Sequence, residues 1–84
     1  MYNLIERYMA IITKDDVANF ATKKGINLSD AEVTFTYNFL KKNWRDYLKN
    51  PNVFDINRYN FSPENFIKVK KVFEEYYQKF GSFL

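Results

Sequence analysis

The sequence has no cysteine and no histidine, and it has only two glycines and two prolines among its 84 residues. Without cysteine there are no disulfide bonds and no thiol nucleophile, and without histidine the commonest general base and metal ligand are missing. Cysteine- and histidine-based zinc sites and Ser-His-Asp triads are therefore excluded. Gly25 and Gly81 stand far apart, so no glycine-rich phosphate loop is present. These absences predict a protein that is not an enzyme and that holds no cofactor and no metal.

Long apolar runs are also absent. The longest runs, such as Met9–Ile12, fall far short of the roughly 20 apolar residues that span a bilayer. The N-terminal stretch has no basic segment before its apolar residues, and Glu6 and Arg7 interrupt them, so it is unlike a signal peptide. We therefore expect a cytoplasmic protein with no membrane contact.

The residues that are abundant are aromatic, amide and lysine residues. A hydrophobic content of 46% and an aromatic content of 20% argue against disorder. Phe, Tyr, Asn, Lys and Ile supply 42 of the 84 residues, a bias typical of AT-rich codons and hence of a low-GC bacterium. The net charge of +3 permits nucleic-acid binding without indicating it. The length predicts a single domain, residues 1–84.

The stretch 30–49 is predicted to form a long central helix. Ser29 and Glu32 have the spacing of a capping box, and Asn50-Pro51 marks the end because the residue before proline avoids the helical region. Apolar residues occur on two opposed faces of this helix. We therefore expect it to lie between other elements.

Three further helices are predicted, at about 3–11, 14–24 and 63–80. Asn3, Thr13 and Ser62 are the expected N-caps, and Gly25 is expected to end the second helix. The stretch 50–61 is predicted to be a loop with at most one helical turn, at Val53–Asp55. The predicted fold is all-α: a small compact bundle of three main helices plus a short N-terminal helix.

Two short patterns are similar to functional motifs. Residues 17–34 have the small residue and turn glycine of a helix-turn-helix, but the turn is too long and Asp30 and Glu32 would face phosphates. Residues 55–66 are similar to a calcium loop, but Asn60 and Phe66 stand where that loop needs glycine and glutamate. We favour an ordinary helical corner and an ordinary loop.

Two surfaces are candidates for binding. The first hypothesis is a non-enzymatic protein-interaction module that binds an unknown partner or self-associates through Phe54, Tyr59 and Tyr47, on or near the 50–61 stretch. Trp44 is interpreted as a core residue rather than an interface anchor. The alternative is a weak nucleic-acid-binding accessory protein, which would use four cations on one face of the central helix. These cations, named the basic strip below, are Lys41, Lys42, Arg45 and Lys49.

One family resemblance accompanies these patterns. It consists of Ile12-Thr13, Asp16-Val17 and Ala21, then Ile26 and Leu28-Ser29, a long helix, an Asn/Pro-rich loop and an aromatic closing helix. Over about residues 11–80 this resembles the Bacillus YqfT-like domain of unknown function, found among short proteins of low-GC Gram-positive bacteria. The resemblance implies a small helical fold and no catalytic residues.

Overall fold

In a computed structural model the chain is a succession of helices, described for residues 2–81 and, in their side chains, for residues 3–79. The α-helices are α1 (Tyr2–Ile11), α2 (Lys14–Lys23), α3 (Asp30–Lys49) and α4 (Pro63–Gly81), and η1 (Pro51–Asn60) is a 3₁₀-helix. No strand occurs between residues 2 and 81, which confirms the all-α prediction. The predicted loop at 50–61 is wrong, because nearly all of it is helical.

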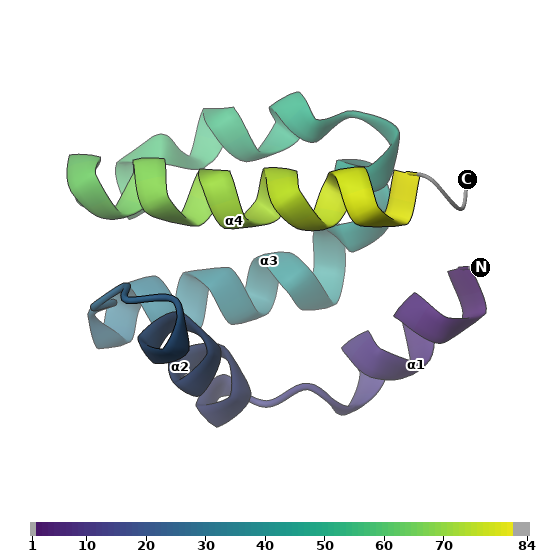
Figure 1. Cartoon of the computed structure of the whole chain (residues 1–84), viewed down its shortest axis with the longest axis horizontal. Helices are drawn as coiled ribbons and strands as arrows, with labels where there is room; N and C mark the ends of the chain where they lie inside the picture. Colours follow the sequence, from purple (N-terminus) through teal and green to yellow (C-terminus); the bar gives the residue numbers. More distant parts are fainter. Residues whose placement is uncertain (1, 82–84) are drawn as a thin grey trace.

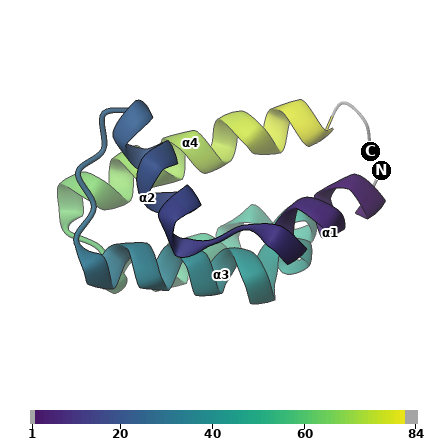
Figure 2. The same ribbon diagram turned by 90° about the horizontal axis from the view of Figure 1, so that it is seen from below.

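The central position of α3 is the main feature of the arrangement (Figure 1). η1 returns along α3, and α4 packs on η1, so that α3 and α4 run in the same direction. On the other side, α1 lies along the C-terminal half of α3 and α2 crosses nearer its N-terminal half (Figure 2). The two apolar faces of α3 thus each have a covering layer, as predicted.

Side-chain caps define most of the helix starts. Thr13 and Ser29 both form capping boxes, with Asp16 and Glu32 as the returning carboxylates. The Ser62 hydroxyl accepts a hydrogen bond from the backbone N of Asn65 at 3.2 Å. The predicted cap at Asn3 is wrong, because α1 begins at Tyr2.

The end of α2 requires a glycine. Gly25 has φ +75°, in the left-handed region that side chains disfavour. The Ile26 backbone N donates to the Ala21 carbonyl at 2.8 Å, and the Gly25 N donates to the Thr22 carbonyl at 3.0 Å. This Schellman motif ends α2 at Lys23 and turns the chain toward α3.

The main core is aromatic and fills the space between α3, η1 and α4. Phe54 is its most enclosed residue, with 1% of its surface exposed. Its ring lies 4.6 Å from the Phe73 ring and 5.4 Å from the Phe39 ring, centroid to centroid. Tyr47 joins the same cluster, 5.4 Å from Phe73. Burial, then the charges of Glu74, Tyr77 and Asp55, raise the pKa of Tyr47 to about 12.

This packing explains why η1 is helical. Asn50 caps it by accepting a hydrogen bond from the Asn52 backbone N at 3.2 Å, and Pro51 occupies its first position. The ion pair between the Lys70 Nζ and the Asp55 Oδ1, at 2.9 Å, ties η1 to α4. Ten residues is long for a 3₁₀-helix. We attribute its persistence to the contacts of Phe54 on both neighbouring helices.

Candidate functional site

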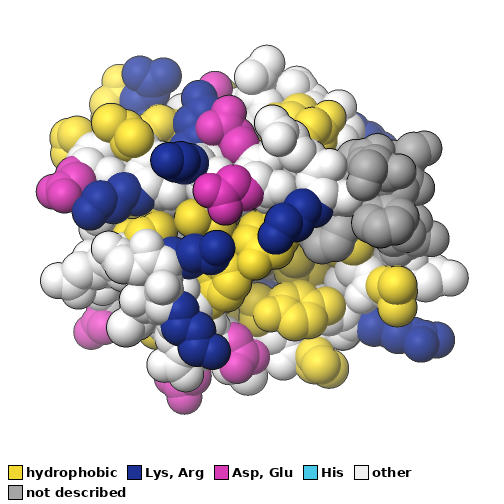
Figure 3. All heavy atoms as spheres, viewed as in Figure 1, with side chains coloured by type: hydrophobic (Ala, Val, Ile, Leu, Met, Phe, Trp, Pro, Cys, Tyr) yellow, Lys and Arg dark blue, Asp and Glu magenta, His cyan; other side chains and the backbone are white. Residues whose placement is uncertain are grey.

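An apolar groove of about 650 Å³ lies between α4 on one side and α1 and α2 on the other, with α3 as its floor. Figure 3 shows this apolar surface in the middle of the molecule, below α4. Its lining contains one charged residue, Asp16. The volume and apolar character are those of ligand- and partner-binding cavities. The lining includes Leu4, Tyr8, Phe20, Trp44, Tyr76 and Tyr77.

The α1 wall of the groove is held to α3 by a small contact. Ile5 packs with Trp44 and Leu48 in a cluster separate from the main core. The Arg45 Nη2 lies 2.6 Å from the Glu6 Oε2, and the guanidinium stands over the Trp44 ring at 4.3 Å. Arg45 therefore fastens α1 to α3 rather than standing free for a phosphate.

A second residue of the basic strip has the same role. The Lys41 Nζ donates a hydrogen bond to the Ala10 carbonyl at the C-terminal end of α1, at 2.9 Å. It also stands over the Tyr37 ring, 5.6 Å from its centroid. A cation at a helix C-terminus is favoured by the helix dipole. Two of the four predicted nucleic-acid contacts are thus engaged within the chain.

One face of α1 carries three exposed apolar side chains. Leu4, Tyr8 and Ile11 are exposed to 66%, 56% and 74%. Their i, i+4, i+7 spacing places them in one row on the helix, which we name the α1 stripe. Leu4 and Tyr8 also line the groove, so the stripe and the groove form one continuous apolar surface.

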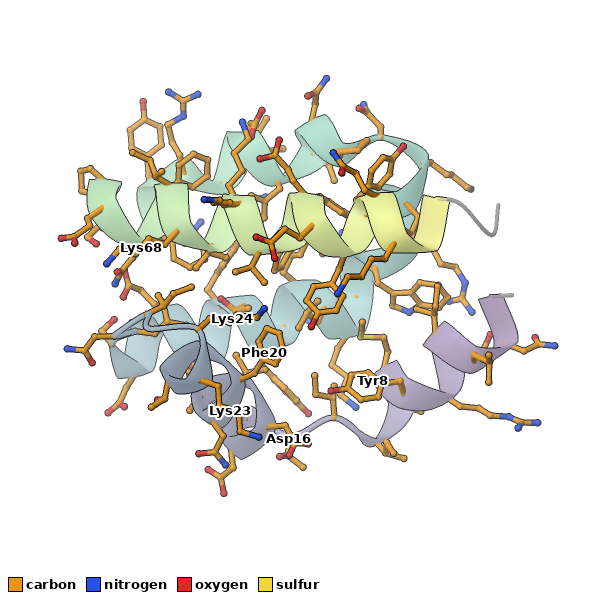
Figure 4. The ribbon with its side chains drawn as sticks, viewed as in Figure 1. Tyr8, Asp16, Phe20, Lys23, Lys24 and Lys68 are labelled. Atoms are coloured by element: carbon orange, nitrogen blue, oxygen red, sulfur yellow. The ribbon has the colours of Figure 1, made fainter. Side chains whose placement is uncertain are left out.

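The groove is closed at its α2 end. The Phe20 and Tyr76 rings meet there at 5.6 Å, joining α2 to α4. The Lys24 Nζ bridges the same helices, 3.9 Å from the Glu75 carboxylate and within 6 Å of both rings. Figure 4 shows Tyr8 and Phe20 projecting from α1 and α2 into the space beside α4. The groove therefore has one blocked end.

The α4 wall is positioned by a buried carboxylate at the start of α3. The Oε2 of Glu32 accepts a hydrogen bond from the Ser62 backbone N at 2.8 Å, and its Oε1 accepts from the Asn65 Nδ2 at 2.8 Å and from the Ser29 N at 2.8 Å. Burial alone raises the pKa of Glu32, but the hydrogen bonds from Ser29, Ser62 and Asn65 outweigh it. The pKa therefore lies below its ordinary value of 4.5. This carboxylate fixes the start of α4 against the start of α3.

The remaining half of the basic strip lines a separate groove of about 540 Å³ between α3 and η1. Most of its lining residues are polar, and we name it the polar groove. Lys42 and Lys49 are exposed there, and neither forms an ion pair with any residue in the described ranges. Asp46 lies between them in sequence and lines the same groove, which reduces its positive charge. Its amide-bearing residues are Asn38, Asn43, Asn50 and Asn57.

The structure does not bring the three predicted partner contacts together. Phe54 and Tyr47 are core residues, so the prediction that they are exposed contacts is corrected by their burial. Tyr47 nevertheless lines the floor of the apolar groove, whereas Phe54 does not. Tyr59 is 92% exposed on η1, and its role in binding stays a prediction. The residue patterns alone do not indicate that Leu4, Tyr8 and Phe20 line a groove. The available signal was the apolar arc of α1, which is wider than one neighbouring helix can cover.

Between residues 3 and 79, no three acidic side chains gather closely enough to hold a metal ion. No helix in the described part of the chain has the length and apolarity to cross a bilayer. Comparisons of the chain with protein-family models, curated proteins and solved structures find no match. The YqfT-like resemblance therefore stays a prediction.

Proposed function

We propose that this protein is a small, non-enzymatic protein-interaction module that binds its partner through the apolar groove and the α1 stripe. The observation that carries the proposal is the exposure of Leu4, Tyr8 and Ile11 in one row beside a groove with a single charged lining residue. Contiguous exposed apolar surface on a folded chain marks an interaction site, whereas isolated apolar residues do not.

The exposed apolar residues elsewhere serve as the reference. Ile56 and Tyr59 on η1 and Ile67 on α4 are exposed to 80%, 92% and 67%. Of these three, only Ile56 lines one of the two grooves, and most of the residues that line that groove are polar. The contact surface proposed here therefore lies on the opposite side of α3 from the 50–61 stretch, where the sequence pattern placed it.

A site-specific photo-crosslinker tests this proposal. The crosslinking amino acid replaces Ile11 in one chain and Ile67 in a matched control, and each is irradiated in a nuclease-treated lysate of a low-GC bacterium. We expect a discrete protein adduct from position 11 and none from position 67. Equal labelling from both positions, or none from either, would contradict the proposal.

A second candidate is weak binding of nucleic acid in the polar groove, favoured by the exposed Lys42 and Lys49. Fluorescence anisotropy with a single-stranded oligonucleotide tests it. If Lys42 and Lys49 hold phosphates, Lys42→Glu with Lys49→Glu abolishes binding, whereas Lys23→Glu with Lys68→Glu, placed outside that groove, weakens it only slightly. Affinity that does not change with salt would exclude this candidate. For both candidate functions we propose that the protein is cytoplasmic and comes from a low-GC bacterium.

A further inference from the structure

We infer that the groove takes α1 of a second copy of this chain, so that each α1 lies at the mouth of the other copy's groove and the two α1 stripes contact one another. This inference rests on the proposed interaction function and names its partner. Three observations lead to it: the length of the groove, the symmetry of the stripe and the position of the charges.

The length of the groove fits a short helix. The α3 residues that form its floor run from Phe39 to Leu48, which is about 14 Å along the helix axis. α1 has ten residues and is about 15 Å long. A helix much longer than this would meet the Phe20–Tyr76 contact that closes the α2 end. The groove therefore suits a partner of about three helical turns.

The α1 stripe is complementary to itself. When two such stripes meet in antiparallel orientation, Leu4 of each copy lies near Ile11 of the other, and both Tyr8 side chains lie near the two-fold axis. Such a pairing is isologous, so it closes as a dimer and leaves no surface for further growth. Because the stripe adjoins the groove, the same two-fold rotation forms the contact between the two stripes and the contact of each α1 with the other copy's groove.

The charges also match. Asp16 is the charged residue of the groove lining. Its Oδ2 accepts a hydrogen bond from the Thr13 backbone N, and no hydrogen bond of the described residues uses its Oδ1. Arg7 borders the stripe and forms no ion pair with any residue of the described ranges. Long side chains on a helix lean toward the N-terminus of that helix. In the antiparallel pair, the N-terminus of α1 in one copy lies beside the start of α2 in the other copy. Arg7 of one copy thus approaches Asp16 of the other.

Sedimentation equilibrium of the purified full chain, over a wide concentration range, tests this pairing. We expect a monomer–dimer equilibrium in the wild type. Ile11→Glu buries a charge in the interface and should raise the dimer dissociation constant at least about tenfold. Ile56→Glu is the matched control, since Ile56 on η1 is similarly exposed, and it should leave the constant unchanged. Circular dichroism verifies that both variants keep their helix content.

A charge exchange tests the orientation. Arg7→Glu and Asp16→Lys each place like charges at both contacts of a homodimer, so each should weaken dimers. Mixing the two variant chains restores opposite charges at both contacts of the mixed dimer. We therefore expect the mixture to dimerise more strongly than either variant alone. Because Asp16 also closes the capping box of α2, circular dichroism verifies that both variants keep their helix content. No recovery in a mixture of two folded variants would overturn the antiparallel arrangement.

The outcomes separate this inference from the proposed function. A wild-type chain that stays monomeric at every concentration, or a dimer indifferent to Ile11→Glu, overturns self-pairing. If a crosslinker at Ile11 then still captures a different protein, the interaction module stands with another partner. If it captures nothing, both proposals fail.

Discussion

The two sides of α3 are held in very different ways. On the η1 and α4 side, Phe39 and Tyr47 enter a continuous aromatic core around Phe54. On the α1 side the packing is divided between two small clusters, one of Ile5, Trp44 and Leu48 and one of Ile12, Val17 and Val33. The contacts that flank α1 are exposed polar ones. α3 is therefore part of a rigid core with η1 and α4 on one side, and on the other side it holds α1 only weakly. Segments with few buried contacts open at low free-energy cost, which suits the α1 side to binding.

Phe54→Ala should produce the largest loss of stability, because it empties the centre of the aromatic core. We expect the free energy of unfolding to fall by about 3–5 kcal/mol, a large fraction of what a small domain has. Urea denaturation followed by circular dichroism measures it. Tyr59→Ala on the same helix is the control and should change stability by less than about 0.5 kcal/mol. Equal effects of the two variants would contradict the core described here.

Glu32→Gln should come next. The neutral amide loses the charge-assisted hydrogen bonds and turns a donor toward the donors of Ser29, Ser62 or Asn65, at a cost of about 2–3 kcal/mol. Because folding lowers the pKa of Glu32, its contribution is present above pH 4.5 and is lost as the pH falls through the lower, folded-state pKa. Denaturation midpoints measured from pH 7 down to pH 3 should therefore decline more steeply in the wild type than in the variant.

Ile5→Ala tests the weak side of the comparison. Replacing a buried isoleucine with alanine usually lowers the free energy of unfolding by about 2–5 kcal/mol. Here we expect a loss of about 1–2 kcal/mol, because α1 can detach without global unfolding. Hydrogen exchange should accelerate in α1 alone, and Trp44 emission should shift to the red. Val69→Ala, in the main core, is the control and should accelerate exchange throughout the chain. Uniform acceleration by both variants would show that α1 is not a separate unit.

Arg45→Ala should have the smallest effect, at most about 1 kcal/mol, because its ion pair with Glu6 is exposed. The loss should again appear as faster exchange in α1, since the guanidinium also covers Trp44. Lys68→Ala removes an exposed pair with Glu64 within α4 and should leave α1 unchanged. The exchange rates of α1 in the Arg45→Ala and Lys68→Ala variants are then compared at low and at high salt. A difference that persists at high salt would indicate that Arg45 stabilises α1 by packing on Trp44 rather than by its charge.

Much of this fold follows from local signals in the sequence. The capping boxes at Thr13 and Ser29 and the glycine at position 25 act within one turn, so the ends of α2 and the start of α3 are readable without tertiary information. The opposed apolar faces of α3 likewise predict its central place. These features need only helical spacing and the preferences of individual residues.

The features that could not be predicted depend on contacts between distant segments. The stretch 51–60 has no period of 3.6, and its 3₁₀ winding arises where Phe54 meets Phe39 and Phe73. The burial of Phe54 and Tyr47 follows from that winding, so both were wrongly expected at the surface. The basic strip is continuous on an isolated helix, but Lys41 and Arg45 are engaged by α1. The candidate groove depends on four helices and was not visible from any one of them.

The hydrogen bonds of Glu32 have a consequence for the order of events in folding. Its contact with Ser62 joins residues 30 positions apart, and it can form only after η1 has returned along the full length of α3. Contacts between positions so distant in sequence are slow to form. If this contact is made after the rate-limiting step, Glu32→Gln should speed unfolding and leave the refolding rate nearly unchanged in stopped-flow experiments. The carboxylate would then act as a late latch that sets how long the native chain survives rather than how quickly it is reached.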